Sequence, residues 1–223
     1  MKINIAVKCM LAVLMMFAAR AGVAGTLAGS AHDFSRVNGV VPAWNLDQKV
    51  CVVCHTPHNS NTSVSDAPLW NHTVTASSFQ MYTSPTLQAT GLSIGGNSKL
   101  CLSCHDGTVA IDSFGGTPTT TQTISSANNI GADLRNDHPI GFTYDTNLVS
   151  KNPSLRDPGT AVTIGAGTSS KVGTIASNML FAGKMECSSC HDVHNTFTVG
   201  SNGSGMVKMA AAGSSLCVAC HNK

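Results

Sequence analysis

Hydrophobic and polar positions alternate over only two short stretches of this 223-residue chain, Ala161-Val-Thr-Ile and Lys171-Val-Gly-Thr-Ile. Alternation of this kind is typical of short strands with one buried face, and the two stretches are close enough to pair as a small hairpin. Helical periodicity is weak and brief, apart from single turns expected at the cysteine motifs described below. The pattern predicts a mostly irregular chain with short helices and a few short strands.

One continuous apolar run stands out, from Cys9 to Ala19, and it follows a start that carries two lysines. Small residues come next, in the letters RAGVAG, which is the layout of a secretory signal peptide. The run is too short to span a bilayer as a stable helix. We therefore expect residues 1–24 to be removed, with cleavage after Ala24 preferred to cleavage three residues earlier. Residues 25–223 are expected to form a single exported domain with no transmembrane segment.

Composition poses a question about the core. The formal net charge is +2 and charged residues make up 11% of the chain, which is too little charge for nucleic-acid binding. Aromatic residues are only 5%, and Gly, Ser, Thr and Asn are abundant between the cysteines. Such a chain struggles to bury enough apolar surface to offset the entropy of ordering. It is either partly disordered or built around something other than side chains.

Eight of the nine cysteines form four pairs with two residues between the members, and every pair is followed at once by histidine. This C-x-x-C-H pattern is the attachment signature of c-type haem. Two cysteines three apart lie on one side of a helical turn, so both can form thioethers with one ring. The next residue then offers its imidazole to the iron. In chain order the motifs are Cys51/Cys54/His55, Cys101/Cys104/His105, Cys187/Cys190/His191 and Cys217/Cys220/His221, hereafter motifs 1 to 4.

Zinc sites, redox dithiols and disulfides are the alternative uses of paired cysteines. None of them requires a histidine after every pair. With nine histidines in 223 residues, four such coincidences have a chance probability of roughly a few in a million, taking positions as independent. Four covalent haems c are therefore the favoured cofactors. They also answer the question of the core, because large apolar rings replace the missing aromatic side chains.

Five further histidines can supply the sixth ligands of four irons: His32, His58, His72, His138 and His194. Methionine is the other common sixth ligand, and Met81, Met179, Met185, Met206 and Met209 follow the signal segment. We expect bis-histidine ligation at all four irons. One of the five histidines is then surplus, and the sequence does not identify it.

Two of these histidines, His58 and His194, come three residues after the motif histidines His55 and His191. A residue so close to the proximal ligand cannot cross to the opposite face of the same ring. Each must bind a neighbouring haem if it binds iron, and the alternative is a role as a hydrogen-bond donor near the haem.

The other three histidines carry less local information. Pro139 favours an extended backbone at His138, which helps to aim its ring. His72 follows a proline by a few residues, and His32 lies near the expected mature N-terminus, where coordination would tie down an otherwise mobile segment.

The motifs have no fixed spacing, so the chain is not a repeat array. We expect one mostly irregular domain wrapped around four closely packed haems. The first two haems and the last two are expected to form sub-clusters.

The arrangement resembles the extracellular multihaem c-type cytochromes that polymerise into nanowires, the OmcE and OmcS type, and is most similar to the tetrahaem OmcE kind. The shared features are CVVCHTPHN at 51–59, CSSCHDVHN at 187–195 and the final CVACH at 217–221. The motifs also resemble the wider doubled-CXXCH cytochromes. The nanowire resemblance implies bis-histidine haems and one iron ligand donated between subunits, at the position that corresponds to His58.

Three functions fit these features. The favoured one is a subunit of an extracellular, electron-conducting homopolymer that exchanges electrons with redox proteins or extracellular acceptors. The alternative is a monomeric periplasmic tetrahaem shuttle made of the same parts. A multihaem reductase is less favoured, because catalysis at haem needs an open iron position and every iron here is expected to have a sixth ligand. We therefore expect electron transfer and not enzymatic activity.

Overall fold

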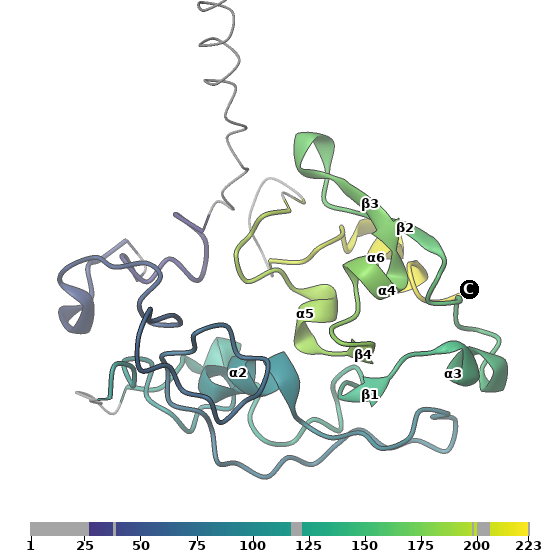
Figure 1. Cartoon of the computed structure of the whole chain (residues 1–223), viewed down its shortest axis with the longest axis horizontal. Helices are drawn as coiled ribbons and strands as arrows, with labels where there is room; N and C mark the ends of the chain where they lie inside the picture. Colours follow the sequence, from purple (N-terminus) through teal and green to yellow (C-terminus); the bar gives the residue numbers. More distant parts are fainter. Residues whose placement is uncertain (1–26, 38, 117–121, 198, 200–205, 223) are drawn as a thin grey trace, which may run out of the picture.

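The computed structural model describes residues 27–37, 39–116, 122–197, 199 and 206–222. The signal peptide predicted at residues 1–24 lies outside these residues. The described chain is mostly irregular, with short helices and a few short strands. In Figure 1, the N-terminal half with α2 and the C-terminal half with the strands and remaining labelled helices lie side by side. None of the helices in the described part is long and apolar enough to cross a membrane.

Short helices make up most of the regular structure. The longest is α2, with ten residues, and the others span four to six. Side-chain caps define the starts of two of them: Asp145 accepts a bond from Leu148 N at 2.8 Å, and Thr174 caps α4 reciprocally with Ser177. The α-helices are α2 (Gly96–His105), α3 (Thr146–Lys151), α4 (Ile175–Asn178), α5 (Cys187–Cys190) and α6 (Ser215–Val218), and the 3₁₀ turns are η1 (Ala43–Asn45), η2 (Ser126–Asn128), η3 (Gly167–Ser169) and η4 (Ala212–Ser214).

Two antiparallel pairs make up the strands. β2 (Ala161–Ile164) pairs with β3 (Lys171–Thr174), with Ala161 opposite Thr174 and Ile164 opposite Lys171. This is the hairpin that the alternating pattern predicts, and the prediction is confirmed. β1 (Phe142–Thr143) pairs with β4 (Lys184–Met185), which joins segments far apart in sequence.

Side-chain packing differs between the two halves. The larger cluster lies in the C-terminal half, where the hairpin, α3 and α4 surround Ile175, which is fully buried. The cluster in the N-terminal half has only three buried members, Val64, Trp70 and Leu100. The N-terminal half is thus the part of the chain with the smaller apolar core made of side chains.

The two halves meet where α2 packs against α5. The Ser98 hydroxyl donates to the Glu186 carboxylate and accepts a bond from Cys187 N at 2.9 Å, and Asn97 bonds to Ser188. Ser98 and Glu186 are 0% and 2% exposed, so this is a buried polar junction. Nearby, Ser93 N donates to Gly141 O at 3.2 Å.

Candidate functional site

Each of the four cysteine motifs contains a helical turn. Motif 2 occupies the end of α2, motif 3 coincides with α5, and motif 4 begins inside α6. Motif 1 is a single turn closed by a bond of 2.9 Å from His55 N to Cys51 O, and the same bond, at 3.0 Å, closes motifs 3 and 4. The expected single turns are therefore present at motifs 1, 3 and 4. Motif 2 differs because α2 is longer, with Leu100 and Leu102 buried against the rest of the half.

A short extended segment crosses three of the turns in the same way, and we call each of these segments a strap. At motif 1, Asn71 N donates to Cys54 O at 3.0 Å, and Thr56 N donates to Leu69 O at 2.9 Å. His55 and Trp70 form the antiparallel bridge between them. The strap of motif 1 is therefore residues 69–71.

The straps of motifs 3 and 4 repeat this pattern bond for bond. Lys208 N donates to Cys190 O at 2.8 Å and Asp192 N to Met206 O at 2.7 Å, which makes 206–208 the strap of motif 3. In motif 4, Arg156 N donates to Cys220 O at 2.8 Å and Asn222 N to Ser154 O at 2.7 Å, which makes 154–156 its strap. This repeat is not visible in the sequence, because LWN, MVK and SLR have no identical residue at any of the three positions.

Motif 2 has no strap of this kind among the described residues, because the helix continues through it. Instead, Ile130 N donates to His105 O at 2.7 Å. Asp106, 4% exposed, follows at once and accepts bonds from the Thr75 hydroxyl and from Thr108 N. The turn is thus held by helix packing and by side-chain bonds.

Hydrogen bonds fix the rings of several histidines through one nitrogen. The Nδ1 atom of His55 lies 2.7 Å from Pro68 O, and that of His105 lies 2.9 Å from Asn128 O. His138 Nδ1 lies 2.9 Å from the carbonyl of Pro139. A carbonyl at Nδ1 places the ring proton there and leaves Nε2 as the basic nitrogen, which is the usual way to orient a metal-binding imidazole.

Three motif histidines each lie against a different non-motif histidine. The ring centres of His55 and His194 are 6.1 Å apart, with planes 18° from parallel. His32 and His105 are also 6.1 Å apart. The centres of His138 and His221 are 6.4 Å apart. The fold thus brings three pairs of histidines that are distant in sequence to nearly the same spacing.

The remaining two non-motif histidines have different surroundings. His72 is 1% exposed, with Nδ1 2.9 Å from Thr73 O and Nε2 3.0 Å from Ala110 O. Its Nε2 also lies 3.7 Å from Cys104 Sγ. His58 is exposed, on the loop that leaves motif 1. Both ring nitrogens of His72 are therefore directed at protein atoms, whereas His58 faces solvent.

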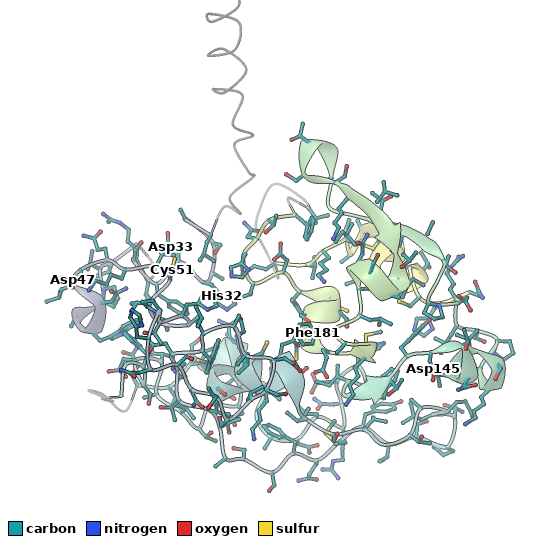
Figure 2. All side chains as sticks on the ribbon, viewed as in Figure 1. His32, Asp33, Asp47, Cys51, Asp145 and Phe181 are labelled. Atoms are coloured by element: carbon teal, nitrogen blue, oxygen red, sulfur yellow. The ribbon has the colours of Figure 1, made fainter. Side chains whose placement is uncertain are left out.

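Three buried polar side-chain atoms in the described chain have no hydrogen-bond partner: Asn97 Oδ1 on α2, and one atom in each of two aromatic rings near the motifs. One of the ring atoms is His32 Nδ1, on a half-buried ring that is packed against His105. The other is Trp70 Nε1, in the strap of motif 1. Figure 2 labels His32 and Cys51 in the same half of the molecule. A buried bare imidazole nitrogen is costly in a polypeptide alone but suits a metal ligand, so the residues present fit an iron-bearing group.

None of the eight motif cysteines forms a disulfide. Burial raises the pKa of Cys54 to about 11, of Cys104 to about 12 and of Cys220 to about 11. Such groups are thiols at neutral pH. A hydrogen bond between Cys101 and Cys187 raises the pKa of the former and lowers that of the latter, which places motifs 2 and 3 in contact.

Electrostatic effects on the cysteines show which motifs lie near each other. Cys54 contributes to the raised pKa of Cys104, after burial, and Cys190 contributes likewise to that of Cys220. Motif 1 therefore lies near motif 2, and motif 3 near motif 4. The grouping of the haems themselves into two sub-clusters stays a prediction.

The family model of the doubled CXXCH motif matches residues 179–223, the segment that holds motifs 3 and 4. No curated protein matches the chain. The doubled motif indicates covalently bound haem c and a role in electron transfer.

Proposed function

We propose that this chain carries electrons through four covalent, bis-histidine c-type haems, one at each motif. A haem supplies an iron that cycles between the ferric and ferrous states. The chain's part would be to hold four such groups, to supply two imidazoles to each iron and to exclude other ligands. The eight motif cysteines would form the thioethers and His55, His105, His191 and His221 the proximal bonds.

The observation that carries this proposal is the common spacing of the three histidine pairs. An imidazole nitrogen binds a metal at about 2 Å and the ring centre lies roughly 1 Å beyond, so two rings on opposite sides of one iron have centres roughly 6 Å apart. The measured separations are 6.1, 6.1 and 6.4 Å. Aromatic contacts alone also span this range, but they do not require each motif histidine to take a separate partner.

The pairs suggest a ligand assignment. His194 would serve the haem of motif 1, His32 that of motif 2 and His138 that of motif 4. His194 then binds a haem other than that of its own motif, as its position three residues after His191 requires. His72 is the proposed surplus histidine, because its Nδ1 and Nε2 atoms lie only 2.9 and 3.0 Å from backbone carbonyls.

By this count, the haem of motif 3 takes its second ligand from His58. His58 is exposed on the motif 1 loop, where it is accessible to a second copy of the chain. We therefore propose that His58 of one subunit binds the haem of motif 3 in the next, in an extracellular conductive filament. A ligand passed in one direction between subunits makes the assembly head-to-tail and open.

The competing function is a monomeric periplasmic shuttle, in which His58 binds no iron or binds one in its own chain. A reductase is the third candidate and needs an iron with an open sixth position. The ligand count favours six-coordinate irons throughout, and therefore electron transfer over catalysis.

Mass spectrometry of the purified protein tests the cofactor. We expect four added haems and a mature N-terminus near Gly25, with spectra of low-spin six-coordinate iron and no methionine-to-iron charge-transfer band. Bound zinc, or free thiols at Cys51 and Cys54, would contradict the proposal. Binding of CO or nitrite to the as-purified filament would instead favour the reductase.

The variant His58→Ala tests the filament. We expect it to fold with four haems, to contain one five-coordinate iron per chain and to form no long polymers under the electron microscope. His72→Gln is the matched control, which should keep four six-coordinate irons and polymerise. Normal polymers of His58→Ala, or a wild-type monomer at high concentration with every iron bis-histidine, would leave the shuttle as the better function.

A further inference from the structure

The straps of motifs 1, 3 and 4 place one residue of each at an equivalent position. Asn71, Lys208 and Arg156 each donate the backbone N–H to the carbonyl of the second motif cysteine, at 3.0, 2.8 and 2.8 Å. The backbone is the same, but the side chains differ in charge. Motif 1 has a neutral amide there, and motifs 3 and 4 have cations.

Arg156 is held firmly over motif 4. Its Nε donates to Val218 O at 2.8 Å, within the motif turn, and its own carbonyl accepts a bond from the Tyr144 hydroxyl at 2.7 Å. Asn71 makes the corresponding bond in motif 1, from Nδ2 to Val52 O. The two side chains therefore make equivalent hydrogen bonds to their motif turns, but only the guanidinium adds a charge, and that charge is permanent.

Lys208 brings a second cation to motif 3. Its Nζ donates to Asn178 O at 2.9 Å, so the ammonium is anchored in the C-terminal half. Its backbone N–H bonds to Cys190 O at 2.8 Å, so the side chain extends from a residue held against the turn of motif 3. Asp192 and Lys171 also lie within reach of Lys208, and Glu186 is buried beside Cys187.

We infer that the side chain at this strap position sets the relative reduction potentials of the haems, with Arg156 and Lys208 raising those of motifs 4 and 3 above that of motif 1. This inference rests on the proposed function, since it concerns the haems placed there. Electrons are then drawn within each chain from the N-terminal half toward the C-terminal half.

The sign follows from charge alone. Reduction adds one electron to the haem, so a nearby cation stabilises the reduced form and an absent or neutral group does not. The effect is greatest where the cation has little compensation. Asp192 lies near Lys208 and accepts three backbone bonds, from His194, Thr196 and Phe197, whereas the neighbour of Arg156 is the exposed Asp157. We therefore expect a larger effect at motif 4 than at motif 3.

Redox titration of the holoprotein, followed through the haem methyl NMR signals, tests the inference. In Arg156→Gln we expect one haem to shift to lower potential, so that its oxidised-to-reduced ratio at fixed potential rises several-fold, where tenfold corresponds to about 59 mV. Lys208→Met should shift a second haem in the same direction by less. The reciprocal variant Asn71→Lys should raise the potential of a third.

Arg156→Lys separates charge from structure, because it loses the Nε bond to Val218 but keeps the cation. We expect it to retain most of the wild-type potential even if it melts at a lower temperature.

Unchanged potentials in Arg156→Gln and Lys208→Met, with four haems bound, would overturn the inference and leave the electron-transfer function intact. Equal shifts in Arg156→Lys and Arg156→Gln would also overturn it, since the effect would then be structural. If Arg156→Gln does not fold, Lys208→Met and Asn71→Lys decide the matter, and fewer than four haems in the wild type would instead contradict the proposed function.

Discussion

Motifs 1, 3 and 4 are held differently from motif 2, although the five-residue signature is the same. The first three are short turns, each crossed by a strap that bonds to the backbone of the turn. Motif 2 ends a ten-residue helix whose buried residues include Ser98, Leu100 and Leu102. A strapped motif is stabilised by backbone bonds to its strap, whereas the helical motif depends on burial of α2, where Leu100 packs within the N-terminal half and Ser98 bonds to the residues of α5 and its cap. Damage near motif 2 should therefore spread further than damage at a strap.

Removal of a haem is expected to give the largest difference between the two kinds of motif. Replacing Cys101 and Cys104 by Ala should lose one haem and destabilise both halves, on the order of 3–5 kcal/mol, as for loss of a large core group. The matched change at Cys51 and Cys54 should lose one haem with a smaller effect, because Cys51 is exposed. Haem counting by mass and melting followed by circular dichroism provide the comparison. Equal destabilisation by the two variants would mean that the helix gives motif 2 no special role.

Close approach of the two halves next to α2 gives the second prediction. Gly141 has a φ of +76°, and an added Cβ would collide with the backbone carbonyl of Ser93. Gly141→Ala should therefore cost more than about 2 kcal/mol of unfolding free energy, through strain and displacement of a backbone segment. Gly91→Ala is the control, because Gly91 has a similar φ of +69° but open space around it. A similar cost in both variants would attribute the effect to φ alone.

The buried junction between α2 and α5 gives a smaller effect. Glu186→Ala removes the acceptor of the buried Ser98 hydroxyl, at a cost of about 1–3 kcal/mol for a buried group left unsatisfied. Asp66→Ala, at an exposed carboxylate, should change stability by less than about 0.5 kcal/mol. Chemical denaturation of the holoproteins measures both, and no loss in Glu186→Ala would show that the junction is not a source of stability.

The same carboxyl group predicts a pH dependence. Burial raises the pKa of Glu186, although the Ser98 hydroxyl and Lys184 favour its ionised form. The folded state thus holds the proton more tightly than the unfolded state. This contribution to stability is complete below the ordinary glutamate pKa and is lost as the pH rises through the raised value. Melting temperatures of wild type and Glu186→Gln should diverge over that range, and parallel curves would contradict the assignment.

The smallest expected change in stability concerns the strap of motif 1. Leu69 is 55% exposed and has a φ of +52°, a conformation that costs non-glycine residues roughly 1–2 kcal/mol. Leu69→Gly should relieve this strain and lose little packing, for a net gain of up to about 1 kcal/mol after the entropy of glycine. Met206 occupies the equivalent strap position with a φ of +46° but is 7% exposed. Met206→Gly should therefore destabilise, and a gain in both variants would mean that burial of Met206 contributes nothing.

Local sequence signals predict some of these features and not others. The hairpin follows from alternation at Ala161–Ile164 and the four turns follow from the cysteine spacing. The length of α2 does not follow from the sequence, because the two glycines at its start, Gly95 and Gly96, have poor helix propensity and predict a turn. Only the tertiary burial of Leu100 and Leu102 offsets this effect.

The sequence likewise predicts only part of the site. It shows which histidines are available and how many there are, but the pairing of His32 with His105 or of His138 with His221 depends on distances across the fold. The second bond that sets His72 apart comes from Ala110, 38 residues away, which no local pattern encodes. The contact between Cys101 and Cys187 likewise exists only because α2 meets α5.

The straps hold their turns largely through main-chain groups, and this has a consequence for the history of such chains. Any residue except proline can donate a backbone N–H. Selection at the donating position of a strap therefore acts on the backbone conformation and only weakly on the identity of the amino acid. Copies of one ancestral unit at 51–71 and 187–208 would keep their bond pattern long after the similarity of their straps had vanished. The doubled-motif family model covers the later unit and not the earlier one, although the two share the same backbone bonds. The common origin of such proteins would then remain recognisable in their backbone hydrogen bonds after the similarity of their sequences had been lost.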